Sequence, residues 1–167
     1  GYPESYYSPP AEGVDEIQIL RGAASLQYGT QFGGLVNFIM KSANNFKPFE
    51  IVNRNTIGSN NLYTNFTSIS YSKEKIKTYA FINYKKGDGF RINSEFRSMN
   101  LFLKSVYQIN KNSKISAEIT YLKYLAKQAG GLTDSMFEQN PYQSNRSRNW
   151  FGVNWLLYNI VYNYNFS

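Results

Sequence analysis

The sequence contains no cysteine and no histidine. Without cysteine the chain has no disulfide and no thiol nucleophile, and without either residue it has no Cys/His zinc site. The absence of histidine also excludes any mechanism that needs an imidazole as general base. The sequence therefore argues against an enzyme, and we expect no catalytic residue, no metal site and no cofactor.

Charged residues are also few, at 17%, and they are unbalanced, with a formal net charge of +7. A basic chain can bind nucleic acid, an anionic membrane surface or an anionic ligand. The basic residues here are scattered, and the tightest clusters are residues 73–77 and Lys85-Lys86. No known nucleic-acid-binding motif is present, although exposed aromatic rings could stack on bases. We expect no nucleic-acid partner.

Residues 150–167 carry no charge over their whole length. A stretch of this length can be a membrane-spanning helix. However, a helix would place Asn154, Asn159, Asn163 and Asn165 in hydrocarbon, and the polar residues repeat with a period nearer two than 3.6. We therefore expect a strand here, with a membrane helix as the alternative.

Aromatic residues are abundant, at 17% of the chain, and they mark a change in composition. Residues 1–48 hold four of the five prolines and six of the 12 glycines. From Phe49 onward, stretches rich in Tyr, Phe, Ile, Val, Thr and Asn alternate with turn residues. The pattern predicts six β-strands. Their expected ranges are 49–57, 62–72, 76–86, 98–109, 114–125 and 150–166.

The side chains in these stretches alternate between two faces. In 114–125, one face carries Ile115, Ala117, Ile119 and Tyr121, and the other carries Ser116, Glu118 and Thr120. Such alternation is typical of antiparallel strands with one polar face. A soluble β-sandwich or barrel with tyrosines in its core fits the same pattern.

The connections favour a transmembrane β-barrel over the soluble alternative. The turns at 72–75 and 110–113 are short, whereas the connections at 87–97 and 126–149 are long, as in outer-membrane barrels. Aromatic residues that we place near strand ends could form an interfacial girdle: Tyr71, Tyr84, Tyr107, Tyr121 and Trp150. Six strands cannot close such a barrel, so this interpretation requires more strands than the chain supplies.

Residues 14–41 read VDEIQILRGAASLQYGTQFGGLVNFIMK. This segment resembles the last part of the plug domain of TonB-dependent outer-membrane receptors, which typically run I-E-V-L-R-G-P-A-S, then Tyr-Gly, then G-G-x-I-N and an apolar strand. Ala23 replaces the usual proline. The positions that match the plug motif, and that we expect to be structural, are Arg21, Gly22, Tyr28, Gly29, Gly33, Gly34 and Asn37.

The resemblance implies two parts: residues 1–45 as the end of a plug domain and residues 46–167 as the first strands of the barrel. Residues 85–94 and 130–151 are similar to loops of ferric-dicitrate-type receptors. The plug segment lacks the pattern expected of glycan importers. The resemblance further implies that the chain is an internal piece of a receptor of roughly 22 strands.

The resemblance also implies a function, the TonB-dependent uptake of a ferric chelate such as ferric citrate or a siderophore. The location implied is the outer membrane of a Gram-negative bacterium. The implied partners are the TonB complex, the ferric chelate, and outer-membrane lipid and lipopolysaccharide. Three alternatives remain: a receptor for another nutrient such as a glycan or cobalamin, a structural subunit of a surface or secretion complex, and a soluble carbohydrate-binding domain.

A ferric chelate is anionic, and arginine suits it because its planar fork binds carboxylates with two hydrogen bonds. The candidate ligand-binding residues that we place on loops are Arg91, Arg97, Gln143, Asn145, Arg146 and Arg148. The alternative is that these arginines pair with nearby carboxylates or with lipopolysaccharide. The carboxylates in question are Asp88, Glu95, Asp134 and Glu138.

Overall fold

The computed structural model describes residues 8–22, 28–29 and 33–166. Within the motif quoted above, Ala23, Ala24 and Ser25 lie outside the described residues. The chain divides into two compact units, Gly1–Ser42 and Ala43–Ser167, and each is described by itself.

The first unit is a two-stranded antiparallel sheet. A 3₁₀ turn, η1 (Ala11–Gly13), leads into β1 (Val14–Leu20), which pairs with β2 (Leu35–Met40). Asn37 lies opposite Gln18, and its Nδ2 donates a 3.0 Å hydrogen bond to Oε1 of that glutamine. β2 is half-buried for most of its length.

A glycine is required where β2 begins. Gly34 has a φ of +129°, and a Cβ at this position would lie 2.5 Å from the carbonyl oxygen of Leu20. Real Cβ atoms do not approach a backbone oxygen this closely. Only glycine lets the two strands approach each other here.

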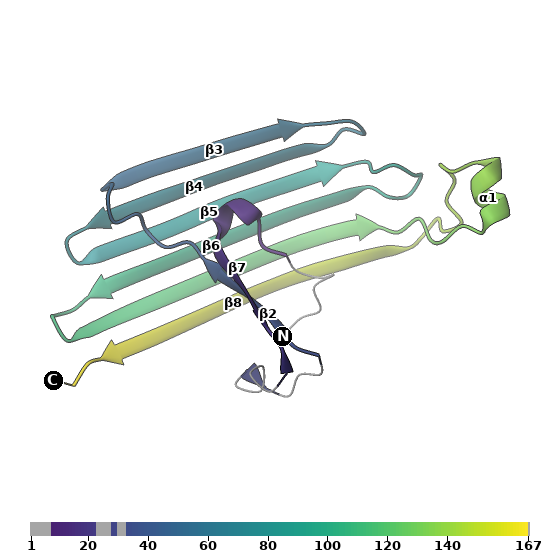
Figure 1. Cartoon of the computed structure of the whole chain (residues 1–167). Helices are drawn as coiled ribbons and strands as arrows, with labels where there is room; N and C mark the ends of the chain where they lie inside the picture. Colours follow the sequence, from purple (N-terminus) through teal and green to yellow (C-terminus); the bar gives the residue numbers. More distant parts are fainter. Residues whose placement is uncertain (1–7, 23–27, 30–32, 167) are drawn as a thin grey trace. The chain divides into compact units, whose positions relative to one another are not determined.

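The second unit is an antiparallel meander of six strands, in which each strand pairs with the next in sequence (Figure 1). The strands are β3 (Phe49–Ile57), β4 (Tyr63–Lys73), β5 (Ile76–Gly87), β6 (Phe96–Gln108), β7 (Ser113–Lys127) and β8 (Trp150–Tyr164). All six predicted strands are confirmed, and residues 150–164 form a strand and not a helix. No described helix is long and apolar enough to cross a membrane. Both units are antiparallel, so the described chain is all-β apart from one short helix.

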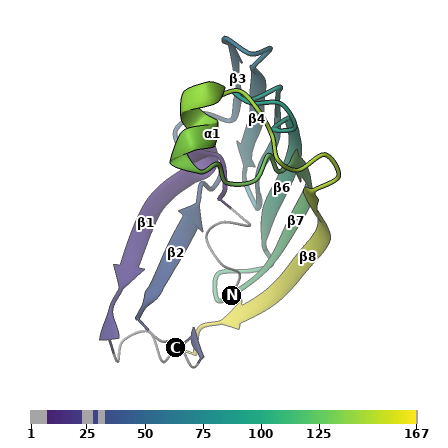
Figure 2. The same ribbon diagram turned by 90° about the vertical axis from the view of Figure 1, so that its right-hand side faces the viewer.

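The sheet is open. Among the described residues, β3 and β8 each pair with a neighbour on one side only, so no closed barrel forms. The connections at one end are short, at 74–75 and 109–112. At the other end they are 58–62, 88–95 and 128–149, and the last contains α1 (Asp134–Gln139). Figure 2 views the molecule from this end, where α1 and the long connections lie.

One face of the sheet carries a band of exposed apolar side chains. Residues paired directly across an antiparallel ladder share a face. One such row crosses all six strands and is apolar throughout: Ile51, Ile69, Ala80, Leu103, Ile119 and Tyr158. Ile69 is 44% exposed and Tyr158 is 79% exposed. We call this side of the sheet the apolar face.

The other side, which we call the buried face, holds an aromatic cluster. Phe81 lies between Phe66 and Phe102, with ring centroids 5.4 Å from each, and Tyr79 lies beside this group. These four side chains are buried. Polar residues share this face, and Asn83 and Asn100 are opposite one another and almost fully buried. The apolar face therefore carries exposed side chains, while the aromatic rings and asparagines of the other face are buried.

Two sequence predictions change at the level of single residues. Tyr121 was placed near a strand end, but β7 continues to Lys127, so Tyr121 lies in the middle of the sheet opposite Leu101 and Leu156. Arg97 was placed on a loop, but β6 begins at Phe96, so Arg97 is a strand residue. In both cases the strand extends two residues beyond the predicted range, because backbone pairing continues to Phe96 in β6 and to Lys127 in β7.

Candidate functional site

Two long connections form one compact pad at the end of the sheet. Residues 88–95 join β5 to β6, and residues 128–149 join β7 to β8. The amide of Ile92 donates to the carbonyl of Tyr142 at 3.0 Å, and the rings of Phe90 and Tyr142 lie 4.8 Å apart. We call these two connections together the loop pad.

Arg91 holds the loop pad together through its guanidinium group. Its Nη1 donates to the carbonyl oxygen of Gly130 at 2.7 Å. Its Nε and Nη2 both donate to the carbonyl oxygen of Gln143, at 3.0 and 2.8 Å. All three guanidinium nitrogens of this candidate ligand-binding residue therefore donate to backbone carbonyls of the neighbouring loop.

Asn93 makes a second connection between the same loops. Its Nδ2 donates to the carbonyl of Arg146 at 2.6 Å and lies near the carbonyls of Gln128 and Asn149. Asn93 has a φ of 59°, a left-handed conformation that asparagine tolerates better than most residues. Sequence reasoning missed this residue, because an asparagine in a loop gives no sign of which loop its amide will reach.

Gln143 and Asn145, the two amide candidates, are also engaged within the loop pad. Gln143 Nε2 donates to the carbonyl of Met136 in α1, and Asn145 Nδ2 donates to the carbonyl of Gly131, both at 2.5 Å. The helix itself begins after Thr133, whose hydroxyl accepts from the amide of Met136 at 3.3 Å. These amides therefore shape the loop and leave few donors for a ligand.

Arg146 and Arg148 differ from the other candidates on the loop pad. Both side chains are exposed, and neither makes a hydrogen bond or ion pair to any residue that the structure describes. None of the four arginines pairs with the carboxylates suggested for them. Asp88 accepts instead from Asn61, and Glu95 from Lys127.

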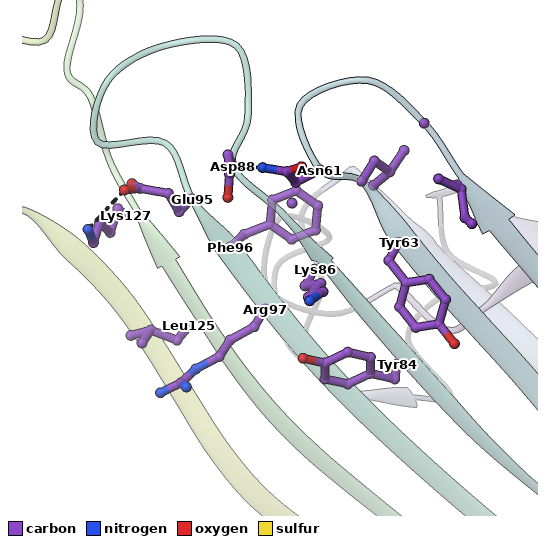
Figure 3. Close-up of a pocket in the computed structure, with 14 residues that line it drawn as sticks. Asn61, Tyr63, Tyr84, Lys86, Asp88, Glu95, Phe96, Arg97, Leu125 and Lys127 are labelled. Carbon is purple, nitrogen blue, oxygen red and sulfur yellow. Dashed lines mark hydrogen bonds and ion pairs between the residues drawn. The ribbon is translucent and has the colours of Figure 1, made fainter.

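A hollow of about 990 Å³ opens on the apolar face, beside the loop pad (Figure 3). It lies over the last residues of β5 and β7 and the first residues of β4 and β6. Its polar and charged lining includes Asn61, Tyr63, Tyr84, Lys86, Asp88, Glu95, Arg97 and Lys127. A smaller hollow of about 510 Å³ shares Tyr84, Arg97 and Leu125 with it and adds Lys123.

Glu95 and Lys127 form an ion pair at the rim of the hollow, with Oε1 and Nζ 3.1 Å apart (Figure 3). A hydrogen bond from its own backbone amide, followed by the hydrogen bond from Lys127, lowers the pKa of Glu95 below its ordinary value. Burial acts in the opposite direction but is outweighed. Glu95 is therefore fixed as a carboxylate whose charge Lys127 already balances.

The two hollows are lined by residues that the sequence analysis did not associate with one another. Lys86 was noted as part of a basic pair, and Arg97 as a loop residue, but the hairpin register places them directly opposite each other. Lys123 was not singled out at all. The signal that could have found them was the symmetry of the β5–β6 hairpin about its loop, which brings together residues equally distant from the loop centre.

Comparison of the sequence with models of known protein families found no match, and a search of curated proteins found none either. A relationship to TonB-dependent receptors therefore stays a prediction from the resemblance of residues 14–41.

Proposed function

We propose that this chain is part of a TonB-dependent outer-membrane receptor that imports a ferric chelate. In this proposal, residues 1–45 belong to the plug domain and the six-stranded sheet belongs to the barrel wall. The loop pad lies outside the cell, and the short turns face the periplasm.

The observation that carries the membrane part of the proposal is the exposed apolar face. Its central row is apolar on all six strands, and the row on each side of it is polar on only two strands, at Asn53 and Thr67 in one row and at Thr78 and Ser105 in the other. In water, a contiguous patch of this size is unfavourable and marks an interaction surface. In a bilayer, it is the surface that the strands of a barrel present to lipid.

The open edges support further strands beside β3 and β8. An unpaired edge in lipid leaves backbone groups without partners, at a cost of several kcal/mol each. A barrel removes both edges. Short turns at one end of the meander and long loops at the other are the arrangement expected of such a barrel.

The ligand proposal rests on Arg146 and Arg148. These are the two exposed arginines of the loop pad, and neither side chain has a hydrogen-bond or ion-pair partner among the described residues. Arginine remains charged at all relevant pH values and matches the geometry of a carboxylate. Ferric citrate and carboxylate siderophores offer such groups, and Arg91 holds the loop that presents the two arginines.

The test is uptake of radioactive ferric citrate by cells that express the whole receptor. We expect uptake that stops when the TonB complex is deleted or the proton gradient is collapsed. The double variant Arg146→Gln/Arg148→Gln should bind ferric citrate about 100-fold more weakly or worse, since it removes two charge-assisted bonds of about 1.5–3 kcal/mol each. Lys75→Gln/Lys111→Gln removes the same charge at the opposite end of the sheet and should bind normally.

A second candidate function is a structural subunit of a surface complex. It is favoured by the exposed apolar side chains on the loop pad, where Phe90, Ile92 and Phe137 are each more than half exposed. Exposed apolar side chains at a loop surface suit a protein partner. This candidate predicts stable co-purification with another protein and no energy-dependent uptake, so the same cells distinguish the two functions.

A further inference from the structure

Three cations line the two adjoining hollows, and no described residue forms an ion pair with any of them. Lys86 on β5 lies directly opposite Arg97 on β6. Lys123 on β7 is diagonal to Arg97, because Arg97 pairs with Leu125. Side chains directly opposite and diagonal in a sheet lie within about 5–8 Å of each other. Like charges placed in this way destabilise a sheet unless something compensates them.

The neighbouring carboxylates do not provide that compensation. Glu95 is bound to Lys127 at 3.1 Å, and Asp88 accepts a hydrogen bond from Asn61. No described residue forms an ion pair with Lys86, Arg97 or Lys123. The three cations therefore form a site that suits an anion with more than one negative charge.

The position of this cluster limits what the anion can be. Lys86, Arg97 and Lys123 lie on the apolar face, and Figure 3 shows Lys86 and Arg97 beside Tyr84 in the hollow. Two residues further along β5 and β6, about 7 Å away, the same face carries the paired side chains Tyr84 and Met99, and the next pair on that face is Ile82 and Leu101. The three cations and the apolar side chains are therefore neighbours on the same face of the sheet.

An anionic amphiphile matches both parts of this surface. A phosphate group would accept two hydrogen bonds from the Arg97 fork and meet the ammonium groups of the two lysines. Acyl chains attached to it would extend over Met99, Leu101 and Ile82, away from the loop pad. A soluble phosphate would use the cations but leave the apolar surface uncovered.

We propose that the two adjoining hollows together bind the phosphate-bearing headgroup of an anionic membrane lipid through Lys86, Arg97 and Lys123. This inference rests on the proposed membrane location and adds a lipid-specific site on the outside of the sheet, separate from the ligand site on the loop pad. The lipid supplies the counter-charge that the paired cations lack and holds the β5–β7 region at the membrane surface.

The test has two parts. The whole receptor is first inserted into nanodiscs of phosphatidylcholine, with and without phosphatidic acid, to establish that it enters a bilayer. Its affinity for lipid is then measured in neutral detergent by adding fluorescent phosphatidic acid. We expect tighter binding of phosphatidic acid than of fluorescent phosphatidylcholine. Each cation near a membrane surface changes affinity roughly fivefold, so Lys86→Gln/Arg97→Gln/Lys123→Gln should weaken binding on the order of 100-fold.

The matched control is Lys73→Gln/Lys75→Gln/Lys111→Gln, which removes three positive charges near the short turns of the same sheet. Equal weakening by both triple variants would reduce the effect to general charge attraction and overturn the proposal. Displacement of the fluorescent lipid by inorganic phosphate alone would also overturn it, because the acyl chains would then contribute nothing. If the receptor enters nanodiscs but shows no preference for phosphatidic acid, the lipid site is wrong while the membrane location stands. If the receptor does not enter nanodiscs, the proposed membrane location is wrong as well.

Discussion

Arg91 and Gly130, which are 39 residues apart, are joined by a 2.7 Å hydrogen bond from Nη1 of the arginine to the carbonyl oxygen of the glycine. The same guanidinium reaches the carbonyl of Gln143 with two further donors. Five N–H donors in a rigid fork allow one arginine to satisfy several carbonyls at once. The loop between β7 and β8 therefore depends on a residue of the loop between β5 and β6.

We expect Arg91→Ala to loosen the loop pad. The carbonyls of Gly130 and Gln143 would lose their donors, at a cost of about 1–3 kcal/mol. Limited proteolysis of the whole receptor should then cut residues 128–149 faster than in the unchanged protein. Arg148→Ala removes an arginine from the same loop without breaking a described contact. If both variants are cut at the unchanged rate, Arg91 does not hold the loop.

Gly130 should not tolerate a side chain. Its φ is +78°, which costs a non-glycine residue about 1–2 kcal/mol, and an added Cβ would overlap Oδ1 of Asn145. We expect Gly130→Ala to lower the free energy of unfolding of the loop pad by at least that amount, measured by hydrogen exchange of residues 128–149.

The neighbouring glycine provides the control for this substitution. Gly131 has no heavy atom within 4 Å of an added Cβ and has an ordinary φ. Gly131→Ala should change exchange by less than about 0.5 kcal/mol. Equal effects of the two substitutions would mean that the conformation of Gly130 is not required.

The acid stability of the loop pad should depend on Glu95. Its pKa is lowered in the folded state by its own backbone amide and by Lys127. The carboxylate therefore stabilises the folded state above its unfolded pKa of about 4.3, and this contribution is lost as the pH falls through the lower folded value. Glu95→Gln should reduce stability at neutral pH and flatten its decline in acid, as followed by thermal unfolding across that range.

Glu138→Gln serves as the charge-matched control for Glu95. Glu138 lies on α1, and no ion pair to it exists among the described residues. We expect its acid profile to resemble that of the unchanged protein. If the stability of Glu95→Gln also declines in acid as that of the unchanged protein does, Glu95 does not contribute to the acid stability of the loop pad.

The strands were predictable from sequence, while the site largely was not. The alternation of Ile115, Ala117 and Ile119 with polar neighbours marks β7, since one face of the strand is apolar through this part of its length. The contacts of Arg91 and Asn93 could not be predicted. The guanidinium of Arg91 and the side-chain amide of Asn93 bind backbone carbonyls more than 30 residues away, and every residue has a backbone carbonyl, so the sequence does not indicate which one is bound. The pairing of Lys86 with Arg97 required the register of a hairpin whose loop residues do not define a standard turn.

The apolar face offers the sharpest test of a membrane location. Ile119 lies at its centre, and its side chain is 41% exposed. In a bilayer, Ile119→Lys would place a charge near the midplane, at a cost of about 2–4 kcal/mol. In water, a lysine at a partly exposed strand position would cost within about 0.5 kcal/mol. We expect Ile119→Lys to reduce insertion of the whole protein into vesicles and its unfolding free energy there.

Ile57→Lys is the matched substitution beyond the band. Ile57 belongs to the same face but lies at the end of β3 beside the long connections, and it is 84% exposed. A lysine there would lie near the interface and cost about 0–1 kcal/mol. A large difference between the two variants means that the sheet has a buried lipid-facing centre and a hydrated end. Equal, small effects would mean that water covers the apolar face, and the proposal of an outer-membrane receptor would then have to be abandoned for a soluble β-protein.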